Sequence, residues 1–239
     1  MKIIIWGYGK MGKVVEKVAK ERGHTIVGII DLNNVAEINK SFLQKADVII
    51  EFTTPNAAPK NYIKCFDAGV PVVSGTTGWL DKKNEIISYC KKNNGTFFYA
   101  SNFSLGMNIF FEVNKFLAKL MSKIPQYNTT IYETHHIHKI DKPSGTAITI
   151  ANQIIEANNK YKNWKLDSAN SSSDIPIKSF REKDVVGTHI VEYKSDIDKI
   201  EIKHEAFSRE GFARGTIIAA EFVKDKKGCF GMQDLLNEL

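Results

Sequence analysis

Three of the six histidines in this 239-residue chain lie within four positions, at His135, His136 and His138, and Lys139 follows them directly. A histidine side chain can hold a transferable proton near neutral pH. A lysine ammonium group can stabilise negative charge that develops during a reaction. The segment therefore indicates acid–base chemistry, with a histidine as the proton carrier and Lys139 as the stabilising cation.

Two other interpretations of this segment are weaker. The HHxH spacing lacks the helical i, i+4 pair of a zinc-binding HExxH motif, and no cysteine is nearby, so we expect no metal site. A solvated polar loop remains a second alternative.

A few residues further on, Pro143-Ser144-Gly145-Thr146 has the composition of a helix start. The backbone N–H groups of a helix N-terminus, together with the hydroxyl groups of Ser144 and Thr146, can hold a carboxylate. A proton donor beside a carboxylate site suits the reduction of a small anionic substrate.

A second motif, GYGKMG at residues 7–12, matches the GxGxxG pattern of dinucleotide-binding loops. It follows a predicted strand and opens a predicted helix, so its backbone can approach a pyrophosphate at a helix N-terminus. Asp31 follows at the end of the next predicted strand, where an acid binds the adenosine ribose. A carboxylate there repels a 2′-phosphate, which slightly favours NADH over NADPH, although Lys10 is within reach of such a phosphate.

The elements that must position these groups alternate between strands and helices over the first hundred residues, as in a parallel sheet with right-handed crossovers. This predicts an α/β fold with a doubly wound, Rossmann-type nucleotide domain. The expected strands are 2–6, 24–30, 47–52, 70–74 and 96–99, and the expected helices are 11–22, 55–68 (opened by Pro55) and 80–92.

After Asn102 the pattern changes to a smaller α+β region, with helices expected at 105–121 and 146–157. Strands are expected at 128–132, 175–180, 190–193 and 197–204, a polar loop at 168–174, and C-terminal helical segments at 215–222 and 232–236.

Composition excludes several classes of protein. The chain is 43% hydrophobic and 25% charged, as in globular proteins, and it has no apolar run long enough to span a membrane. Three widely spaced cysteines and the absence of a recognisable signal peptide favour a reduced, cytoplasmic protein. The net charge of +6 is spread along the chain, and no recognition motif accompanies it, so we expect no nucleic-acid partner.

Residues 133–147 fit the E-x-H-H-x-x-K-x-D-x-P-S-G-T-A signature, so the sequence resembles the dihydrodipicolinate reductase family. The resemblance extends along nearly the whole chain. Its further motifs are Lys10-Met11-Gly12, Glu51-Phe52-Thr53-Thr54-Pro55, Ser74-Gly75-Thr76-Thr77-Gly78, Ser101-Asn102-Phe103-Ser104, Gly187-Thr188-His189 and Phe212-Ala213-Arg214-Gly215.

The resemblance implies NADH- or NADPH-dependent reduction of 4-hydroxy-tetrahydrodipicolinate to tetrahydrodipicolinate in lysine (diaminopimelate) biosynthesis. It implies His135 as the proton donor and Lys139 as the second catalytic residue. The implied substrate ligands are His136, Ser144, Gly145 and Thr146. The implied cofactor ligands are Gly7, Gly9, Lys10, Met11, Gly12, Asp31, Phe52, Thr53, Gly75, Thr76, Thr77, Ser101, Asn102 and Phe103.

The resemblance also implies a discontinuous organisation. Residues 1–106 and 210–239 would form the dinucleotide-binding domain, and residues 107–209 a substrate-binding domain whose sheet builds a homotetramer. The alternatives are another small two-domain dehydrogenase, which would lack the combined H-H-x-x-K and P-S-G-T-A motifs, and a nucleotide-sensing regulator, which would not need the His135–Lys139 pair.

Overall fold

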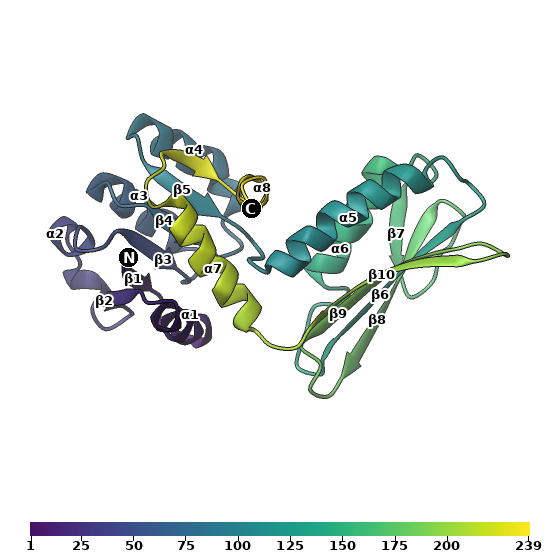
Figure 1. Ribbon diagram of the computed structural model, residues 1–239, viewed down its shortest axis with the longest axis horizontal. Coiled ribbons are helices and arrows are strands. Elements are labelled where there is room, and N and C mark those ends of the chain that lie inside the picture. The colour runs from purple at the N-terminus through teal and green to yellow at the C-terminus, as the bar shows by residue number, and fades with distance from the viewer. The chain divides into compact units, whose positions relative to one another are not determined.

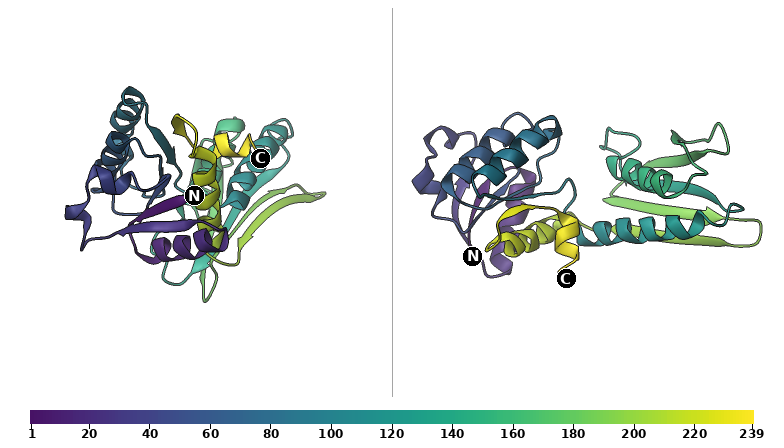
Figure 2. Two further views of the ribbon diagram at one scale, coloured as in Figure 1. Left: turned by 60° about the vertical axis from the view of Figure 1, so that its left-hand side comes forward. Right: turned by 90° about the horizontal axis from the view of Figure 1, so that it is seen from above.

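The computed structural model describes all residues from 1 to 239, and the chain divides into two units. The first unit comprises residues 1–105 and 210–239, and the second comprises residues 106–209. Figures 1 and 2 show the elements of each unit, which are described separately below.

The first unit contains a six-stranded parallel sheet with the strand order β11-β5-β4-β3-β1-β2. Its strands are β1 (Lys2–Trp6), β2 (Thr25–Ile30), β3 (Val48–Glu51), β4 (Val72–Ser74), β5 (Thr96–Tyr99) and β11 (Gly228–Phe230). The chain passes from β1 to β2 on one side and to β3 on the other, so the direction of winding reverses between β1 and β3. Ligands of such sheets bind at the carboxyl ends of the strands at this switch point.

Helices cover both faces of this sheet (Figure 1). The side chains of β1 alternate between the two faces: Ile3 and Ile5 pack with α1 (Lys10–Glu21), α7 (Glu210–Val223) and α8 (Met232–Leu236). On the opposite face, Ile4 and Trp6 pack with α2 (Lys40–Leu43), α3 (Ala58–Ala68) and α4 (Lys83–Lys92). Burial on both faces explains the continuous apolar run of this strand. Short 3-10 turns, η1 (Val35–Glu37) and η2 (Leu80–Lys82), complete the unit.

The second unit contains a five-stranded mixed sheet with the order β10-β9-β6-β8-β7. Its strands are β6 (Asn128–His136), β7 (Asn163–Leu166), β8 (Asp174–Glu182), β9 (Gly187–Lys194) and β10 (Lys199–Ala206). β6 pairs parallel with β8 and antiparallel with β9. The helices α5 (Leu105–Met121) and α6 (Gly145–Ala157) pack with this sheet in one hydrophobic core (Figure 2). The α/β fold with a smaller mixed-sheet region is thus confirmed.

Several predicted boundaries were wrong. Pro55 does not open a helix: residues 55–57 form a turn in which the Thr54 carbonyl oxygen accepts from Ala57 and Ala58, and α3 starts at Ala58. β6 extends to His136, four residues beyond the predicted end at Tyr132. The short strands β7 and β11, which are four and three residues long, were not predicted.

No helix of the structure combines the length and the apolar character that crossing a membrane requires.

Candidate active site

The glycine loop between β1 and α1 is built by three glycines with different roles. Gly7 has a φ of +101°, and a Cβ atom there would lie 1.9 Å from the carbonyl oxygen of Phe52. A Cβ atom on Gly12 would lie 2.3 Å from the carbonyl oxygen of Gly7. The fold itself therefore requires glycine at these two positions.

Gly9 is different, because a Cβ atom there would meet no atom within 4 Å. It caps the N-terminus of α1, and no side chain fulfils the capping role. Since the protein itself leaves this space open, the free backbone N–H groups at the helix start remain accessible to an anion. The loop thus fits a pyrophosphate group.

Two cavities flank the glycine loop. A cavity of about 580 Å³ is lined by Asp31, Leu32, Asn33, Tyr8 and other residues around the end of β2. The carboxylate of Asp31 accepts a hydrogen bond of 2.8 Å from the backbone N–H of Asn33. This cavity has the position of an adenosine site beside the first strand of a dinucleotide fold.

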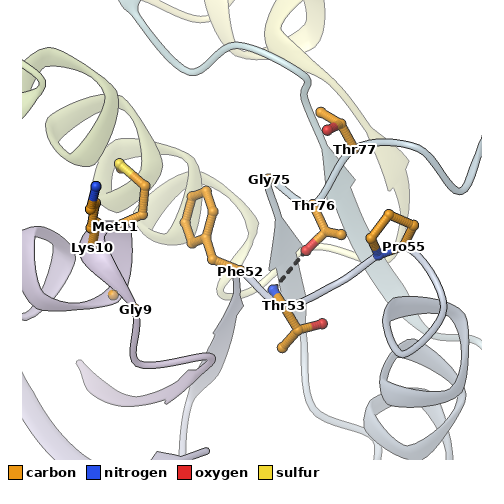
Figure 3. Close-up of a pocket in the computed structure, with 10 residues that line it drawn as sticks. Gly9, Lys10, Met11, Phe52, Thr53, Pro55, Gly75, Thr76 and Thr77 are labelled. Atoms are coloured by element: carbon orange, nitrogen blue, oxygen red, sulfur yellow. Dashed lines mark hydrogen bonds between the residues drawn. The ribbon is translucent and has the colours of Figure 1, made fainter. Parts of the chain in front are cut away.

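The second cavity, of about 300 Å³, lies at the carboxyl ends of β3 and β4 (Figure 3). Its lining is Gly9, Lys10, Met11, Gly12, Phe52, Thr53, Pro55, Gly75, Thr76 and Thr77. A Cβ atom on Gly75 would lie 2.1 Å from the ring of Phe52, so glycine makes room for that ring. The backbone N–H of Thr53 donates a 2.8 Å hydrogen bond to Oγ1 of Thr76, which joins the two loops.

Most of the predicted cofactor residues therefore line one of these two cavities, but residues 101–103 do not. Phe103 is only 3% exposed, and its ring packs against Phe52 and Phe98. Phe103 therefore supports the ring of Phe52, which lines the second cavity. Oδ1 of Asn102 accepts a hydrogen bond from the backbone N–H of Ser104, and Ser101 is exposed.

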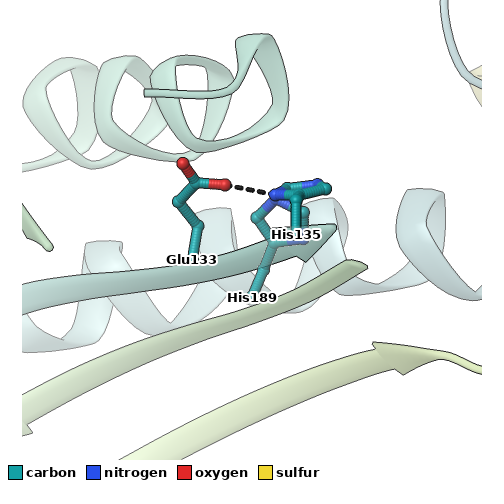
Figure 4. A group of neighbouring side chains, drawn as sticks. All are labelled: Glu133, His135 and His189. Atoms are coloured by element: carbon teal, nitrogen blue, oxygen red, sulfur yellow. Dashed lines mark hydrogen bonds and ion pairs between the residues drawn. The ribbon is translucent and has the colours of Figure 1, made fainter. Parts of the chain in front are cut away.

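In the second unit, the extension of β6 places Glu133 and His135 on the same side of one strand, two residues apart (Figure 4). Nδ1 of His135 forms a hydrogen bond with Oε2 of Glu133. Glu133 is fully buried, and the His135 side chain is 11% exposed. Since Nδ1 is engaged, Nε2 is the ring nitrogen left for proton transfer.

Three other groups fix Glu133. Its Oε1 atom accepts hydrogen bonds from Oγ of Ser179, from a guanidinium nitrogen of Arg181 at 3.1 Å and from the backbone N–H of Ser144 at 3.3 Å. Burial opposes the ionisation of Glu133, but the hydrogen bonds from His135, Ser179 and Arg181 outweigh it and lower its pKa to about 2. At neutral pH a buried carboxylate therefore holds the imidazole of His135.

His189 on β9 completes this group, although the sequence motif that contains it suggested no role. Its ring centroid lies 5.1 Å from that of His135, and its Nε2 atom forms a 3.2 Å hydrogen bond with Oγ of Ser144. Burial and the neighbouring His135 lower its pKa to about 3, so the ring is neutral near pH 7. A Cβ atom on Gly187 would lie 3.1 Å from Nε2 of His135, so glycine keeps the space beside that nitrogen open.

The donor atoms of Glu133, His135 and His189 lie within 4.8 Å of one another, as in a metal site. The carboxylate, however, is already bound by His135, Ser179 and Arg181. A metal ion would have to displace these donors and lie beside the positive charge of Arg181. The arrangement suits a hydrogen-bonded histidine better than a metal centre.

Three of the predicted substrate residues, Ser144, Gly145 and Thr146, lie at the start of α6. Ser144 caps this 13-residue helix, with Oγ accepting from the backbone N–H of Ala147 at 3.2 Å. Gly145 is exposed and Thr146 is half-buried. The Lys139 ammonium group lies 2.7 Å from an Oδ atom of Asp141, so this cation is paired within the chain.

His136, which points away from the Glu133 side of β6, forms no hydrogen bond through its buried Nδ1 atom. Burial and the nearby positive charge of Arg209 lower its pKa. The structure therefore brings together His135 and Ser144 from the predicted set. The residues whose roles sequence reasoning missed are Ser179, Arg181 and His189, all more than 40 positions away along the chain from their partners Glu133 and Ser144.

The glycine loop at the switch point of a parallel sheet, together with a histidine held by a buried carboxylate, defines an oxidoreductase of the Rossmann class. Family models for the N-terminus and the C-terminus of dihydrodipicolinate reductase match residues 1–103 and 106–236. The chain belongs to the dihydrodipicolinate reductase family, which confirms the resemblance of its motifs.

Curated relatives agree with this assignment. A 4-hydroxy-tetrahydrodipicolinate reductase from Christiangramia forsetii is 50% identical over 239 residues, which cover 100% of this chain and 99% of the relative. One from Methanocaldococcus jannaschii is 37% identical over 87% of this chain and 77% of the relative.

Solved structures share the fold. A dipicolinate-bound dihydrodipicolinate reductase from Paenisporosarcina sp. TG-14 superposes with a TM-score of 0.80 at 22% identity, covering 98% of both chains. A probable dehydrogenase from Thermotoga maritima has a TM-score of 0.56 at 12% identity, covering 98% of this chain and 92% of that chain.

Proposed function

We propose that this protein reduces 4-hydroxy-tetrahydrodipicolinate to tetrahydrodipicolinate with NADH or NADPH. The observation that carries the proposal is the Glu133–His135 pair beside the N-terminus of α6, in a chain that also has an open glycine loop. The names of the curated relatives support the same reaction, and the dipicolinate bound to the Paenisporosarcina protein supports a cyclic dicarboxylate as substrate.

The first unit supplies the cofactor ligands in this proposal. The residues around Gly9 bind the pyrophosphate, Asp31 binds the adenosine ribose, and the second cavity accommodates the nicotinamide ring between Phe52 and Thr76. When bound, the reduced nicotinamide would supply hydride to the substrate. Ser101 and Asn102 remain proposed ligands from the family resemblance, whereas Phe103 supports the ring of Phe52.

His135 is the proposed general acid. Glu133 fixes Nδ1, so Nε2 carries the proton into the space beside Gly187. The carboxylate also fixes the orientation of the imidazole ring, so that Nε2 keeps one direction for proton transfer during each turnover. Ser179 and Arg181 keep Glu133 ionised and in place.

The start of α6 and the adjacent loop are the proposed substrate cradle. The backbone N–H groups at Gly145 and Thr146 and the positive end of the helix dipole suit a carboxylate. Lys139 provides a further positive group, and His136 remains a proposed substrate ligand from the family resemblance. Because Asp141 pairs with Lys139, a substrate carboxylate would take the place of Asp141 on that ammonium group.

NADH is slightly favoured as the cofactor. Asp31 places a negative charge in the larger cavity, where a 2′-phosphate would be repelled, and Lys10 lines the smaller cavity instead. No lysine or arginine lines the cavity that contains Asp31, so this cavity offers no cation to bind the 2′-phosphate of NADPH.

The second unit is the proposed substrate-binding and tetramerisation domain, which the family resemblance implies for residues 107–209. It exposes large apolar side chains on α5 and on the outer strand β10, among them Ile109, Phe116 and Ile200. Large apolar side chains exposed in this way are typical of subunit interfaces. A homotetramer built through this sheet would cover it.

A coupled assay tests the proposed reaction. Dihydrodipicolinate synthase would generate the unstable substrate from pyruvate and aspartate semialdehyde, and the absorbance of NADH or NADPH would be followed in separate reactions. We expect oxidation that depends on both proteins, with a higher kcat/KM for NADH. If protein that binds a cofactor oxidises neither, the fold serves another substrate and the role of His135 must be revised.

A further inference from the structure

A second buried carboxylate, Glu51, lies behind the smaller cavity of the first unit. It is the last residue of β3 and is completely inaccessible to solvent. Its Oε1 atom accepts a hydrogen bond from Oγ1 of Thr53, and its Oε2 atom accepts from Oγ of Ser74 at 2.7 Å and from Oγ1 of Thr76 at 2.9 Å. The amide of Asn61 donates to Oε1 at 3.4 Å.

The directions of these bonds identify Glu51 as an acceptor throughout. The Thr76 hydroxyl group accepts from the backbone N–H of Thr53 at 2.8 Å, and the Ser74 hydroxyl group accepts from the backbone N–H of Thr76 at 3.2 Å. Each hydroxyl group has one proton. Glu51 is the acceptor for the proton of Thr76, and the Ser74 hydroxyl group, which also lies 2.7 Å from the hydroxyl group of Tyr62, donates to Oε2 of Glu51 when it accepts from Tyr62. With hydrogen-bond donors at both of its oxygen atoms, Glu51 lies in a network that suits the ionised form.

This carboxylate has no cationic partner, unlike Glu133. Burial raises its pKa, and the groups that oppose this effect are the neutral side chains of Thr53, Ser74, Thr76 and Asn61. An unpaired buried charge is costly, and a neutral side chain of the same shape would hold the two loops together at a lower cost. The charge itself therefore needs an explanation beyond holding the fold.

The position of Glu51 supplies that explanation. Its partners Thr53 and Thr76 line the smaller cavity (Figure 3). Gly9 of the glycine loop lines both this cavity and the one that contains Asp31. A dinucleotide that places its ribose at Asp31 extends its nicotinamide end toward this cavity. An oxidised nicotinamide ring carries a positive charge, whereas the reduced ring is neutral.

We propose that Glu51 is a positioning residue whose negative charge makes the nicotinamide pocket favour the oxidised, cationic ring. This inference rests on the proposed cofactor site and deepens it. Glu51 polarises the hydroxyl groups of Thr53 and Thr76, which line the pocket, and its negative potential thereby extends to the nicotinamide ring. Glu51 itself contacts no ligand. The same bias stabilises the positive charge that the ring acquires as it gives up hydride.

The test measures binding rather than turnover. Dissociation constants for NAD⁺ and NADH would be determined by calorimetry for the wild type, E51Q, E51D and E85Q. Glu85 is an exposed acid on α4, so E85Q makes the same change of charge away from the pocket. Two unit charges about 10 Å apart at an effective dielectric constant near 20 correspond to roughly a tenfold change in binding.

We therefore expect E51Q to raise the ratio of the NAD⁺ to the NADH dissociation constant about tenfold, while E51D and E85Q keep it near the wild-type value. A purely structural role would weaken both forms equally in E51Q, leave the ratio unchanged and overturn the inference. Wild-type protein that binds neither form would overturn the proposed cofactor site as well, which distinguishes the two failures.

Thermal unfolding would show whether E51Q is folded. If it is not, S74A replaces it, because this variant removes the 2.7 Å donor to Oε2 and leaves the residues of the cavity wall in place. The ionised form of Glu51 is then less stable, and we expect the ratio to rise about threefold. An unchanged ratio in folded S74A would overturn the inference equally.

Discussion

Replacing Glu133 with glutamine tests whether a buried carboxylate organises the site. The pKa of Glu133 falls from the reference value of 4.5 to about 2 on folding. Because the folded pKa is below the unfolded one, the carboxylate stabilises the protein above pH 4.5 and loses this effect as the pH falls toward 2. The shift corresponds to about 3 kcal/mol at pH 7 and about 1.5 kcal/mol at pH 3.

Loss of the ion pair between Glu133 and Arg181 has a cost of the same magnitude. E133Q leaves the charge of Arg181, which is 16% exposed, without its carboxylate, and breaking a buried pair costs about 3–5 kcal/mol. Arg181 also donates to the carbonyl oxygens of Phe180, Asp141 and Lys139, which favours the lower end of that range.

Urea unfolding of wild type and E133Q at pH 7 and pH 3 measures these values. We expect E133Q to be destabilised by about 3 kcal/mol at pH 7 and by about half as much at pH 3. E182Q is a matched control, because Glu182 is exposed at the end of β8, and it should change stability by less than about 0.5 kcal/mol. A destabilisation by E133Q that is equal at the two pH values would refute the reasoning.

Three further predictions concern the reaction. H135Q should lower kcat by about 10²–10⁴-fold with little change in cofactor affinity, whereas H138Q, at an exposed position, should leave kcat unchanged; an active H135Q enzyme would remove the proton-donor role. D31A should weaken NADH binding about tenfold and NADPH binding less, and equal losses in titrations with the two cofactors would contradict the ribose contact. G187A places a methyl group 3.1 Å from Nε2 of His135 and should lower kcat roughly tenfold at unchanged stability, so normal turnover by that variant would show that Nε2 is not the reacting nitrogen.

Sequence patterns predicted most of the fold because its main elements bury regular apolar faces. The helices at 105–121 and 232–236 and the strand at 96–99 have the predicted bounds. β11 was missed because three residues, Gly228 to Phe230, are too few to show a period. This segment is a strand because it pairs with the exposed edge of β5.

The candidate site was predictable only where its residues are adjacent in sequence. The histidine segment and the glycine loop each carry a local motif. The prediction ended β6 at Tyr132 because the residues that follow it are polar, yet Glu133 is buried. Its burial depends on Ser179 and Arg181 from β8, and no local pattern indicates that these side chains meet it.

The edge strand β11 and the covering helix α7 have a consequence for the newly synthesised chain. Residues 1–105 leave the ribosome first, but their sheet lacks its last strand and one covering layer until residues 210–239 follow. Residues 106–209 are continuous and contain their own core. The second unit can therefore complete its folding before the first unit does, although part of the first unit is synthesised earlier. The order of folding is thus expected to differ from the order of synthesis, and the apolar face that α7 later covers is exposed in the meantime.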